Sequence, residues 1–410
     1  MLNFDVAIIG GGPAGMAAAL SVYETGASVV IVDKDKQLGG ILNQCVHQGF
    51  GQQYFGKEVV GTEYARIFAE KINASKVEVL LNSFVTEVSK EKVLTVCSQE
   101  KGMVLISAKA IVFAMGCRER TAGTLGLAGE RPVGVWTAGT AKKLAINGIK
   151  VGNEVVILGS GDIGLIAARR MTHEGAKVKM VCEIMPRTNA LERNIKDCLT
   201  DLNIPLRLST TVTRVEGKKR VTGVYISKVD KDLKPVEGTD ELIPCDCLLL
   251  SVGLIPENEL CRPLGLDTSG VTGGAIVDEY RQTSVGGFFS CGNSLHVHDL
   301  VDNVSFEAHI AGYSAGLYAL DRLSKGKTVS VKAGSGIRYV LPQKLHKGSG
   351  EATLHFRTTD VFKNVRIVAE CNGQELASVL MESASPGKLG GLRINKQKIS
   401  GEITLCVKEQ

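Results

Sequence analysis

The stretch DVAIIGGGPAG, residues 5–15, decides the fold of this chain. Its apolar start is of strand type, and the G-x-G-x-x-G turn that follows leads into an alanine-rich helical stretch from Met16 to about Thr25. A second apolar run covers residues 29–32 and ends at Asp33. A strand, a glycine turn, a helix, a second strand and an acid within about 30 residues are typical of the βαβ unit that binds a dinucleotide.

The three glycines of this turn have different tasks in a dinucleotide site. Gly10 permits the tight turn, Gly12 lets the backbone approach a pyrophosphate, and Gly15 lets the helix sit close to the strand. The helix N-terminus then offers free N–H groups to the phosphates, and the acid after the second strand is placed to accept hydrogen bonds from a ribose. The further contacts predicted in this unit are Pro13, Ala14, Asp33 and Lys34.

The same pattern occurs a second time. A strand over residues 154–158 leads into the turn GSGDIG, residues 159–164, and a helix runs from Leu165 to about His173. A second strand, residues 177–182, ends at an acid that follows the last glycine by 19 residues, close to the usual spacing of about 20. The contacts predicted in this unit are Gly159, Gly161, Asp162, Ile163, Gly164 and Glu183.

The acid of the second unit indicates which nicotinamide dinucleotide binds there. A carboxylate at Glu183 favours an unphosphorylated ribose, because it would repel a 2′-phosphate. The prediction is therefore NAD(H), although Arg187 is close enough in the sequence to leave NADP(H) open. Two such units predict two dinucleotides in one chain, which suits hydride transfer from one cofactor to the other.

The composition limits the other classes of function. The chain has 410 residues, enough for two or three domains, and its net charge of +5 gives no reason to expect a nucleic-acid partner. Its eleven cysteines are scattered and odd in number, unlike the framework of a small secreted domain. We find neither a secretion signal nor an apolar run long enough for a transmembrane segment, and we expect a cytoplasmic location.

Two further motifs indicate which unit holds which cofactor. A strand over residues 110–115 is followed by Gly116, and residues 283–293 end in Gly292-Asn293 before a helix. With the first glycine turn, these motifs resemble the flavin-binding pattern of the pyridine nucleotide-disulfide oxidoreductase superfamily. In that family a glycine-aspartate pair holds the ribityl chain of FAD. Asn293 stands at the aspartate position, and its amide can still hydrogen-bond a hydroxyl.

This resemblance covers about residues 1–325 and implies an α/β fold with two Rossmann-like dinucleotide-binding domains of the three-layer β/β/α type. Residues 1–117 and 256–328 would form a discontinuous FAD-binding domain, and residues 118–255 would form the NAD(H)-binding domain inserted into it. The resemblance further implies cofactor contacts at Gly40, Val85, Ala114, Gly116, Gly292, Asn293 and, in the nicotinamide domain, Gly253.

Residues 329–410 carry a different pattern, in which alternating apolar stretches are separated by turns rich in Gly, Pro, Asn and Lys. This pattern predicts a small C-terminal antiparallel β domain, folded as a sandwich. We expect it to serve docking or oligomerisation, including formation of a homo-oligomer. The predicted strands are residues 337–341, 352–356, 365–369, 378–380 and 403–407.

The chain departs from its family at both positions where redox disulfides occur. Glutathione-reductase-like members carry C-x4-C after a Gly-Gly, and here these positions hold Leu42 and His47. Thioredoxin-reductase-like members carry C-x-x-C in the second domain, and here these positions hold Ala138 and Ala141. Dithiol exchange needs an attacking thiolate and a partner sulfur, so the usual disulfide reduction is not expected.

At finer grain, four stretches resemble a subfamily of flavoproteins from fermentative and anaerobic bacteria. These proteins are paired with an anaerobic-type glycerol-3-phosphate dehydrogenase and a small cysteine-containing protein, and more distant relatives are subunits of opine oxidases and hydrogen cyanide synthase. The resemblance implies a subunit that relays electrons between a partner flavoprotein and NAD(H). The stretches are residues 116–120, 159–170, 253–259 and 291–303.

Cys45 and His47 are the candidate catalytic residues, since they follow the Gly-Gly in the segment that would run along the flavin ring. Cys45 could form a sulfenic acid, as in a stand-alone NADH oxidase or peroxidase, or it could be a small residue in the flavin wall. His47 could protonate a reduced flavin or acceptor, or it could be structural. A further alternative is an amine or opine oxidase-type subunit.

A histidine pair near the C-terminal flavin motif is the remaining candidate for special chemistry. His296, His298 and Asp299 follow Gly292-Asn293, but a metal site would need a third and fourth ligand at sensible spacing. We therefore expect no metal there, and a role in shaping the flavin pocket or in contacting a partner instead.

Overall fold

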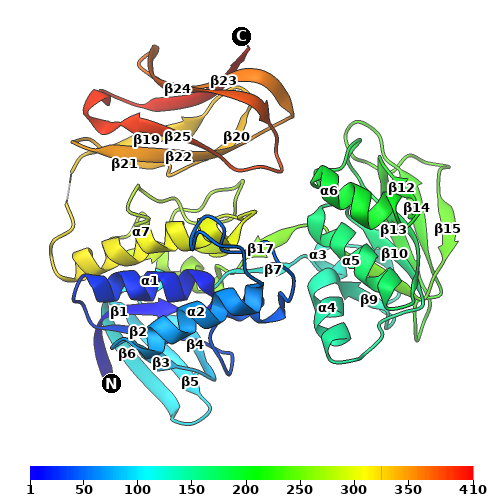
Figure 1. Ribbon diagram of the computed structural model, residues 1–410, viewed down its shortest axis with the longest axis horizontal. Coiled ribbons are helices and arrows are strands. Elements are labelled where there is room, and N and C mark those ends of the chain that lie inside the picture. The colour runs from blue at the N-terminus through cyan, green and yellow to red at the C-terminus, as the bar shows by residue number, and fades with distance from the viewer. Residues whose placement is uncertain (325, 410) are drawn as a thin grey trace. The chain divides into compact units, whose positions relative to one another are not determined.

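The computed structural model describes residues 1–324 and 326–409, which fold into two compact units. Unit one comprises Met1–Cys117 and Pro256–Gln410, and unit two comprises Arg118–Ile255. Unit two is therefore an insertion in the chain of unit one, and Figure 1 shows that each unit has its own sheets and helices. The chain enters and leaves unit two through two short strands that pair with each other, β7 (Cys117–Glu119) and β17 (Leu254–Pro256).

Unit one is built on a seven-stranded sheet that carries the first glycine turn at the end of an interior strand. β1 (Leu2–Ile9) lies between β2 (Val29–Val32) and β6 (Gly102–Phe113) and is parallel to both. The order is β3-β2-β1-β6-β5-β4, with β18 also paired to β6. The other strands are β3 (Glu78–Leu80), β4 (Ser83–Val88), β5 (Val93–Ser98) and β18 (Phe288–Ser290).

Three helices cover one face of this sheet: α1 (Pro13–Glu24), α2 (Gly61–Asn73) and α7 (Val301–Ala319). In Figure 1, α1 and α7 run side by side over the sheet. Alanine and glycine are frequent in their contact, and the Cα of Gly312 faces the backbone of Ala18 at a distance that leaves no room for a Cβ. The β4–β5 hairpin packs its apolar residues on the opposite face, which produces the β/β/α layering.

Unit two has the same three layers. Its parallel sheet, in the order β12-β11-β10-β16-β9, packs helices on one face and the sheet β15-β14-β13-β8 on the other. The helical segments are α3 (Ala122–Leu125), α4 (Ala138–Ile146), α5 (Asp162–His173), α6 (Glu192–Ile195) and a π-helical turn (Lys196–Thr200). The strands are β8 (Ala128–Gly129), β9 (Val135–Thr137), β10 (Glu154–Leu158), β11 (Lys177–Cys182), β12 (Leu206–Arg207), β13 (Thr210–Glu216), β14 (Gly223–Lys228), β15 (Glu241–Pro244) and β16 (Cys247–Leu250).

The C-terminal strands form a β sandwich that belongs to unit one. Its sheets have the orders β21-β19-β26-β23-β24 and β20-β22-β25, and one apolar cluster lies between them. The antiparallel prediction is wrong for one pair, because β19 and β26, the first and last strands of the sandwich, lie side by side and run in the same direction. The strands are β19 (Thr328–Ala333), β20 (Ile337–Leu341), β21 (Lys344–His346), β22 (Glu351–Thr358), β23 (Phe362–Cys371), β24 (Gln374–Ala384), β25 (Gly390–Asn395) and β26 (Ile403–Glu409).

Helix starts and one strand length differ from the sequence prediction. Both turn helices begin three residues early, at Pro13 and Asp162, because the last residues of each glycine turn already have helical backbone. β6 begins at Gly102 rather than at residue 110, because its first half pairs with β5 in a hairpin that the apolar pattern did not indicate.

The described helices are short or polar by the standard of a membrane protein. The 19-residue helix α7 buries Asp302 and Glu307 among its alanines and glycines. Within residues 1–324 and 326–409, none of the helices combines the length and the apolar composition that crossing a membrane requires.

The close α1–α7 contact predicts a strong effect of one methyl group. Gly312→Ala should lower the free energy of unfolding by roughly 1–3 kcal/mol, because the added Cβ meets the Ala18 backbone, which cannot move away like a side-chain tip. Urea denaturation of both variants measures this effect. Gly123→Ala is the matched control in an exposed helix, where a Cβ meets only the Thr121 hydroxyl oxygen at 3.8 Å, and equal losses in both variants would contradict the prediction.

Candidate cofactor and active site

The two glycine turns have the same backbone geometry, although they lie in different units. The first glycine of each has a positive φ, +107° at Gly10 and +105° at Gly159, which L side chains rarely adopt. Each also faces a carbonyl on the neighbouring strand end, that of Ala114 or Ser251, so closely that a Cβ could not fit. Both the backbone conformation and the lack of space for a Cβ therefore require glycine at these two positions.

At the other two motif positions, each turn has one glycine with no space for a Cβ and one with open space beside it. A Cβ on Gly15 would collide with the carbonyl oxygen of Gly10, and one on Gly164 would collide with that of Gly159. In contrast, a Cβ on Gly12 or Gly161 meets no atom within 4 Å. The backbone is therefore bare at the helix N-terminus of both turns, where a pyrophosphate needs to approach.

The N-termini of α1 and α5 are suited to bind phosphate. In the described structure no side chain caps either helix, and the N-cap residues are Gly12 and Gly161. The first N–H groups of a helix have no intrahelical partner and carry the positive end of the helix dipole. A dinucleotide pyrophosphate in the open space would satisfy these donors.

The acids at the ends of β2 and β11 bind their glycine turns in the same way. Asp33 accepts hydrogen bonds from the backbone N–H groups of Gly11 and Asp35, and the Asp35 distance is 2.7 Å. Glu183 accepts from the N–H of Ser160 at 2.9 Å, from its hydroxyl at 2.7 Å and from the N–H of Met185 at 2.9 Å. Burial raises the pKa of the Asp33 carboxyl, against the backbone hydrogen bonds that lower it. Each carboxylate thus braces the turn and keeps lone pairs for a ribose.

Three remote segments converge on the first turn, and each brings a residue that the sequence assigned to FAD. A Cβ on Gly40 would lie 3.1 Å from the Cα of Gly12, and one on Gly292 would lie 2.8 Å from the Cβ of Ala14. The third residue is Ala114, whose carbonyl faces Gly10. Gly116 follows it with a positive φ of +74° and accepts a backbone hydrogen bond from Glu257 at 3.0 Å.

Asn293 follows Gly292 at the edge of this arrangement and is partly exposed. Its side-chain oxygen accepts the backbone N–H of His298 at 3.1 Å, and its amide nitrogen lies 3.5 Å from the sulfur of Cys117. Asn293 therefore fixes the loop that follows it and also contacts Cys117, the first residue of β7.

Several residues that were predicted to contact a cofactor have surroundings that differ from those of the turn glycines. Val85 is 4% exposed and packs in the apolar core, so that only its backbone could reach a cofactor. Asp162 accepts the N–H of Leu191 at 2.9 Å and the amide of Asn194 at 2.6 Å, so it holds the loop before α6. Lys34 and Ile163 are exposed beside their turns, and Gly253 accepts the N–H of Arg120 at 3.1 Å, two residues after the Ser251 carbonyl that faces Gly159.

The candidate catalytic residues lie at the end of a short 3-10 helix, Gly40–Gln44, beside the first turn. Gly39 anchors this segment through a hydrogen bond from its N–H to the carbonyl of Gly11 at 2.9 Å. Cys45 is partly exposed, with its sulfur 3.5 Å from the carbonyl of Ile41. His47 is exposed, with its Nδ1 2.9 Å from the carbonyl of Gln48.

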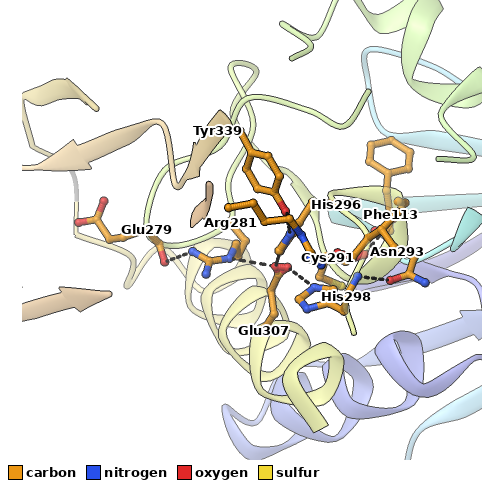
Figure 2. A network of polar contacts seen from close by, with 12 residues as sticks. Phe113, Glu279, Arg281, Cys291, Asn293, His296, His298, Glu307 and Tyr339 are labelled. Atoms are coloured by element: carbon orange, nitrogen blue, oxygen red, sulfur yellow. Dashed lines mark hydrogen bonds and ion pairs between the residues drawn. The ribbon is translucent and has the colours of Figure 1, made fainter. Parts of the chain in front are cut away.

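His296 and His298, which the sequence singled out, belong to a buried cluster whose carboxylate the sequence did not indicate, and Figure 2 shows this cluster around Glu307. Glu307 lies in the second turn of α7. One of its carboxylate oxygens is hydrogen-bonded to Nε2 of His296 at 3.2 Å, and the other is hydrogen-bonded to Nε2 of His298 at 3.1 Å. The side chains of His296, His298 and Glu307 are 1%, 3% and 4% exposed. Arg281 lies 3.6 Å from the first oxygen, and the Tyr339 hydroxyl lies 3.2 Å from His296 Nδ1. The sequence did not indicate Glu307, because this residue is separated from the histidine loop along the chain and only the fold of helix α7 places it beside His296 and His298.

Burial and proximity set the charges in this cluster. Burial, together with the neighbouring His298, lowers the pKa of His296 to about 4, so His296 is neutral at pH 7. Burial alone would raise the pKa of the Glu307 carboxyl, but His296 and His298 hold it well below its usual range. The cluster therefore contains an ionised carboxylate with the Arg281 guanidinium as its cationic neighbour.

The β sandwich holds the loop that carries the two histidines. Arg357, on β22, donates to Asp299 at 2.6 Å and to the carbonyl of Val297 at 3.0 Å. The backbone N–H of Leu389 donates to the other Asp299 oxygen at 3.0 Å. Asp299 therefore does not join His296 and His298, as its position in the sequence suggested, but pairs with the sandwich.

These features define an α/β oxidoreductase fold with two dinucleotide units. The family model described as pyridine nucleotide-disulphide oxidoreductase matches residues 4–311. The chain belongs to this family, which uses FAD and NAD(P)H as cofactors. The glycine turns, with their bare helix N-termini and bracing acids, fit both cofactors.

Individual relatives are distant. The chain is 25% identical over 292 residues to hydrogen cyanide synthase subunit HcnB of Pseudomonas protegens, a match that covers 65% of this chain and 60% of that protein. It is 25% identical over 293 residues to thioredoxin reductase of Listeria monocytogenes, which covers 71% of this chain and 85% of the relative. The crystal structure of T. acidophilum thioredoxin reductase is similar with a TM-score of 0.62 and 24% identity, over 78% of this chain and 99% of that one. That likeness supports the fold.

The open position of each turn predicts a change that separates binding from stability. Gly12→Ala should weaken FAD binding by roughly tenfold or more, because the methyl group occupies the path of the pyrophosphate, and should leave the stability of the apoprotein unchanged. The wild-type protein provides the reference, and flavin fluorescence on titration with FAD measures the affinity.

Gly161→Ala is the matched control, since it makes the same change in the other unit. It should weaken binding of the nicotinamide dinucleotide and leave FAD affinity unchanged. If Gly12→Ala and Gly161→Ala weakened FAD binding equally, the assignment of FAD to unit one would be wrong.

Proposed function

We propose that this chain is an FAD-dependent oxidoreductase that relays electrons between NAD(H) and a partner flavoprotein or another protein acceptor. The observation that carries this proposal is the duplicated glycine turn, with open space at Gly12 in unit one and at Gly161 in unit two. We assign FAD to unit one, where the segments containing Gly40, Ala114 and Gly292 converge, and NAD(H) to unit two.

The residues of the chain bind and orient, and bound FAD supplies the hydride and electron chemistry. The N-terminus of α1 would hold the FAD pyrophosphate, with Asp33 at the ribose and Asn293 at the ribityl chain. The N-terminus of α5 and Glu183 would hold NAD(H) in the same way. Both acids are already fixed by backbone hydrogen bonds, so little side-chain freedom is lost on binding.

The route to the acceptor does not use a dithiol. Ala138 and Ala141 occupy the first turns of α4, and both are buried in the core of unit two. At the other family position, Leu42 is buried and His47 is exposed. With no sulfur at either position, a protein partner that accepts electrons from flavin, or donates them, fits the chain better than a disulfide substrate.

We propose that the partner is a glycerol-3-phosphate dehydrogenase-like flavoprotein of anaerobic type, together with a small cysteine-containing protein. The relative HcnB is named as a subunit of a larger enzyme, which supports a role in an assembly. The β sandwich offers a surface for docking or for a homo-oligomer. None of the eleven cysteines forms a disulfide in the described structure, which fits a reducing, cytoplasmic setting.

A second candidate function is a stand-alone NADH oxidase or peroxidase that works through Cys45. The observation in its favour is the position of Cys45, which is partly exposed on the segment that Gly39 anchors to the first glycine turn. An amine or opine oxidase-type subunit is a variant of the relay proposal, and the similarity to HcnB supports it.

Glu183 predicts the preference between the two nicotinamide dinucleotides. NADH should reduce the flavin about tenfold faster than NADPH or more at limiting nucleotide, because the Glu183 carboxylate repels a 2′-phosphate. Glu183→Ala should narrow this ratio. Anaerobic stopped-flow absorbance at the flavin band measures both rates.

Two variants serve as controls. Glu183→Gln keeps an acceptor for Ser160 and removes the charge, so it should narrow the ratio without loosening the turn. Glu237→Ala removes an exposed carboxylate from the same unit and should leave the ratio unchanged. Equal reduction of the wild type by NADPH and NADH would show that Arg187 or a neighbour binds the phosphate.

Cys45→Ser separates the relay from the stand-alone enzyme. A relay should tolerate this substitution, with less than about a twofold change in flavin reduction by NADH, because the cysteine takes no part in hydride transfer. A peroxidase should lose peroxide turnover, because serine cannot form a sulfenic acid. Oxygen and peroxide consumption with NADH provide the readout.

Isolation of the native assembly tests the partner. A relay should be slow alone and should support glycerol-3-phosphate-dependent reduction of NAD when it is purified with its partner. Rapid peroxide turnover by the chain alone, abolished by Cys45→Ser, would overturn the relay proposal.

A further inference from the structure

The cluster of His296, His298 and Glu307, here called the triad, brings three metal-ligating side chains close together. The two imidazole nitrogens lie 3.2 and 3.1 Å from the carboxylate oxygens, and the ligand atoms all lie within 4.8 Å of one another. In a tetrahedral site with bonds of about 2.0–2.1 Å, neighbouring ligand atoms stand roughly 3.3 Å apart. Each of the two imidazole–carboxylate distances is therefore close to the length of one edge of such a site.

We propose that His296, His298 and Glu307 bind one divalent transition-metal ion of the Zn²⁺ type, with a water-derived ligand in the fourth position. Two imidazoles and one carboxylate suit Zn²⁺ or Fe²⁺, whereas Ca²⁺ and Mg²⁺ prefer oxygen donors. The ion ties the loop that begins at Asn293 to helix α7, behind the residues assigned to the flavin.

The ligands are held in place by partners outside the triad. The Tyr339 hydroxyl lies 3.2 Å from Nδ1 of His296, the kind of outer contact that orients a metal-bound imidazole. The backbone of His298 is held by the side chain of Asn293. In contrast, Nδ1 of His298 is buried and has no hydrogen-bond partner among the described residues, and the ring hydrogen-bonds through Nε2 and packs against the His296 ring. A loop fixed in this way loses little freedom when it binds an ion.

The guanidinium of Arg281 opposes binding. It lies 3.6 Å from the carboxylate of Glu307 and is 3% exposed, so an incoming cation meets a positive charge that solvent does not screen. A hydroxide as the fourth ligand reduces this cost. The opposition has a measurable consequence, because removal of the Arg281 charge must strengthen metal binding if the triad is the site.

Metal content of the full-length protein, purified without a polyhistidine tag, tests the proposal. Growth in zinc-supplemented medium should give about one ion per chain by elemental analysis. Growth with Co²⁺ should give the visible bands of tetrahedral cobalt beyond the absorption of oxidised flavin. Neither readout needs enzymatic turnover, so failure here is distinguishable from failure of the proposed function.

Substitutions assign the ion to the triad. His298→Ala and Glu307→Gln should each lose the ion. Arg281→Gln should bind Zn²⁺ at least about tenfold more tightly, because a buried like charge is removed. His346→Ala is the matched control, since His346 contacts the carboxylate of Glu279 at 3.1 Å and belongs to no such triad among the described residues, and this variant should keep its ion.

Several outcomes would overturn the proposal. One is folded wild-type protein that contains no stoichiometric metal after growth with zinc or cobalt and takes up none on titration, which would make the triad a hydrogen-bonded carboxylate. Another is an ion that persists in both triad variants, which would be adventitious. A third is weaker zinc binding by folded Arg281→Gln. Circular dichroism and flavin absorbance identify variants that fail to fold, and the wild-type measurements decide the matter without them.

Discussion

The structure depends on the approach of backbone to backbone at glycine. In both turns the last glycine lies against the carbonyl of the first, and the first lies against the carbonyl of a neighbouring strand, with no room for a single methyl group. This closeness brings each helix N-terminus over the end of its sheet, where phosphates bind. The same constraint recurs in unit one, since Gly40 and Gly292 bring remote segments onto the first turn, and Gly312 allows α7 to lie on α1.

Much of the fold is local and was predictable. Strands β2, β10 and β11 have the predicted bounds, because each is a continuous apolar run between turn signals. Strand β21 was missed because it has only three residues, and β25 because it begins with two glycines and pairs with β22 from an earlier part of the sequence. Strand β19 was missed although its apolar residues alternate. The parallel β19–β26 pair joins opposite ends of the sandwich sequence, and the local alternation of apolar residues cannot predict such a pairing.

The candidate site divides in the same way. The glycine turns and their acids follow one another along the chain, so spacing alone indicated them. The buried cluster combines a loop with a residue from α7, and its neighbours Arg281 and Tyr339 come from other parts of the chain. Sequence proximity therefore grouped His296 and His298 with Asp299, whereas the fold pairs Asp299 with Arg357 and supplies Glu307 instead.

The insertion of unit two has a consequence for biosynthesis. Helix α1 ends at Glu24, but its cover α7 begins only at Val301, after all of unit two has been made. At ribosomal rates of about 5–20 residues per second, this delay lasts on the order of tens of seconds. During that time the apolar faces of α1 and the first sheet stay uncovered on the nascent chain, while unit two, a continuous segment, can complete its own core. Unit one, which we assign to FAD, therefore finishes last, although it is begun first.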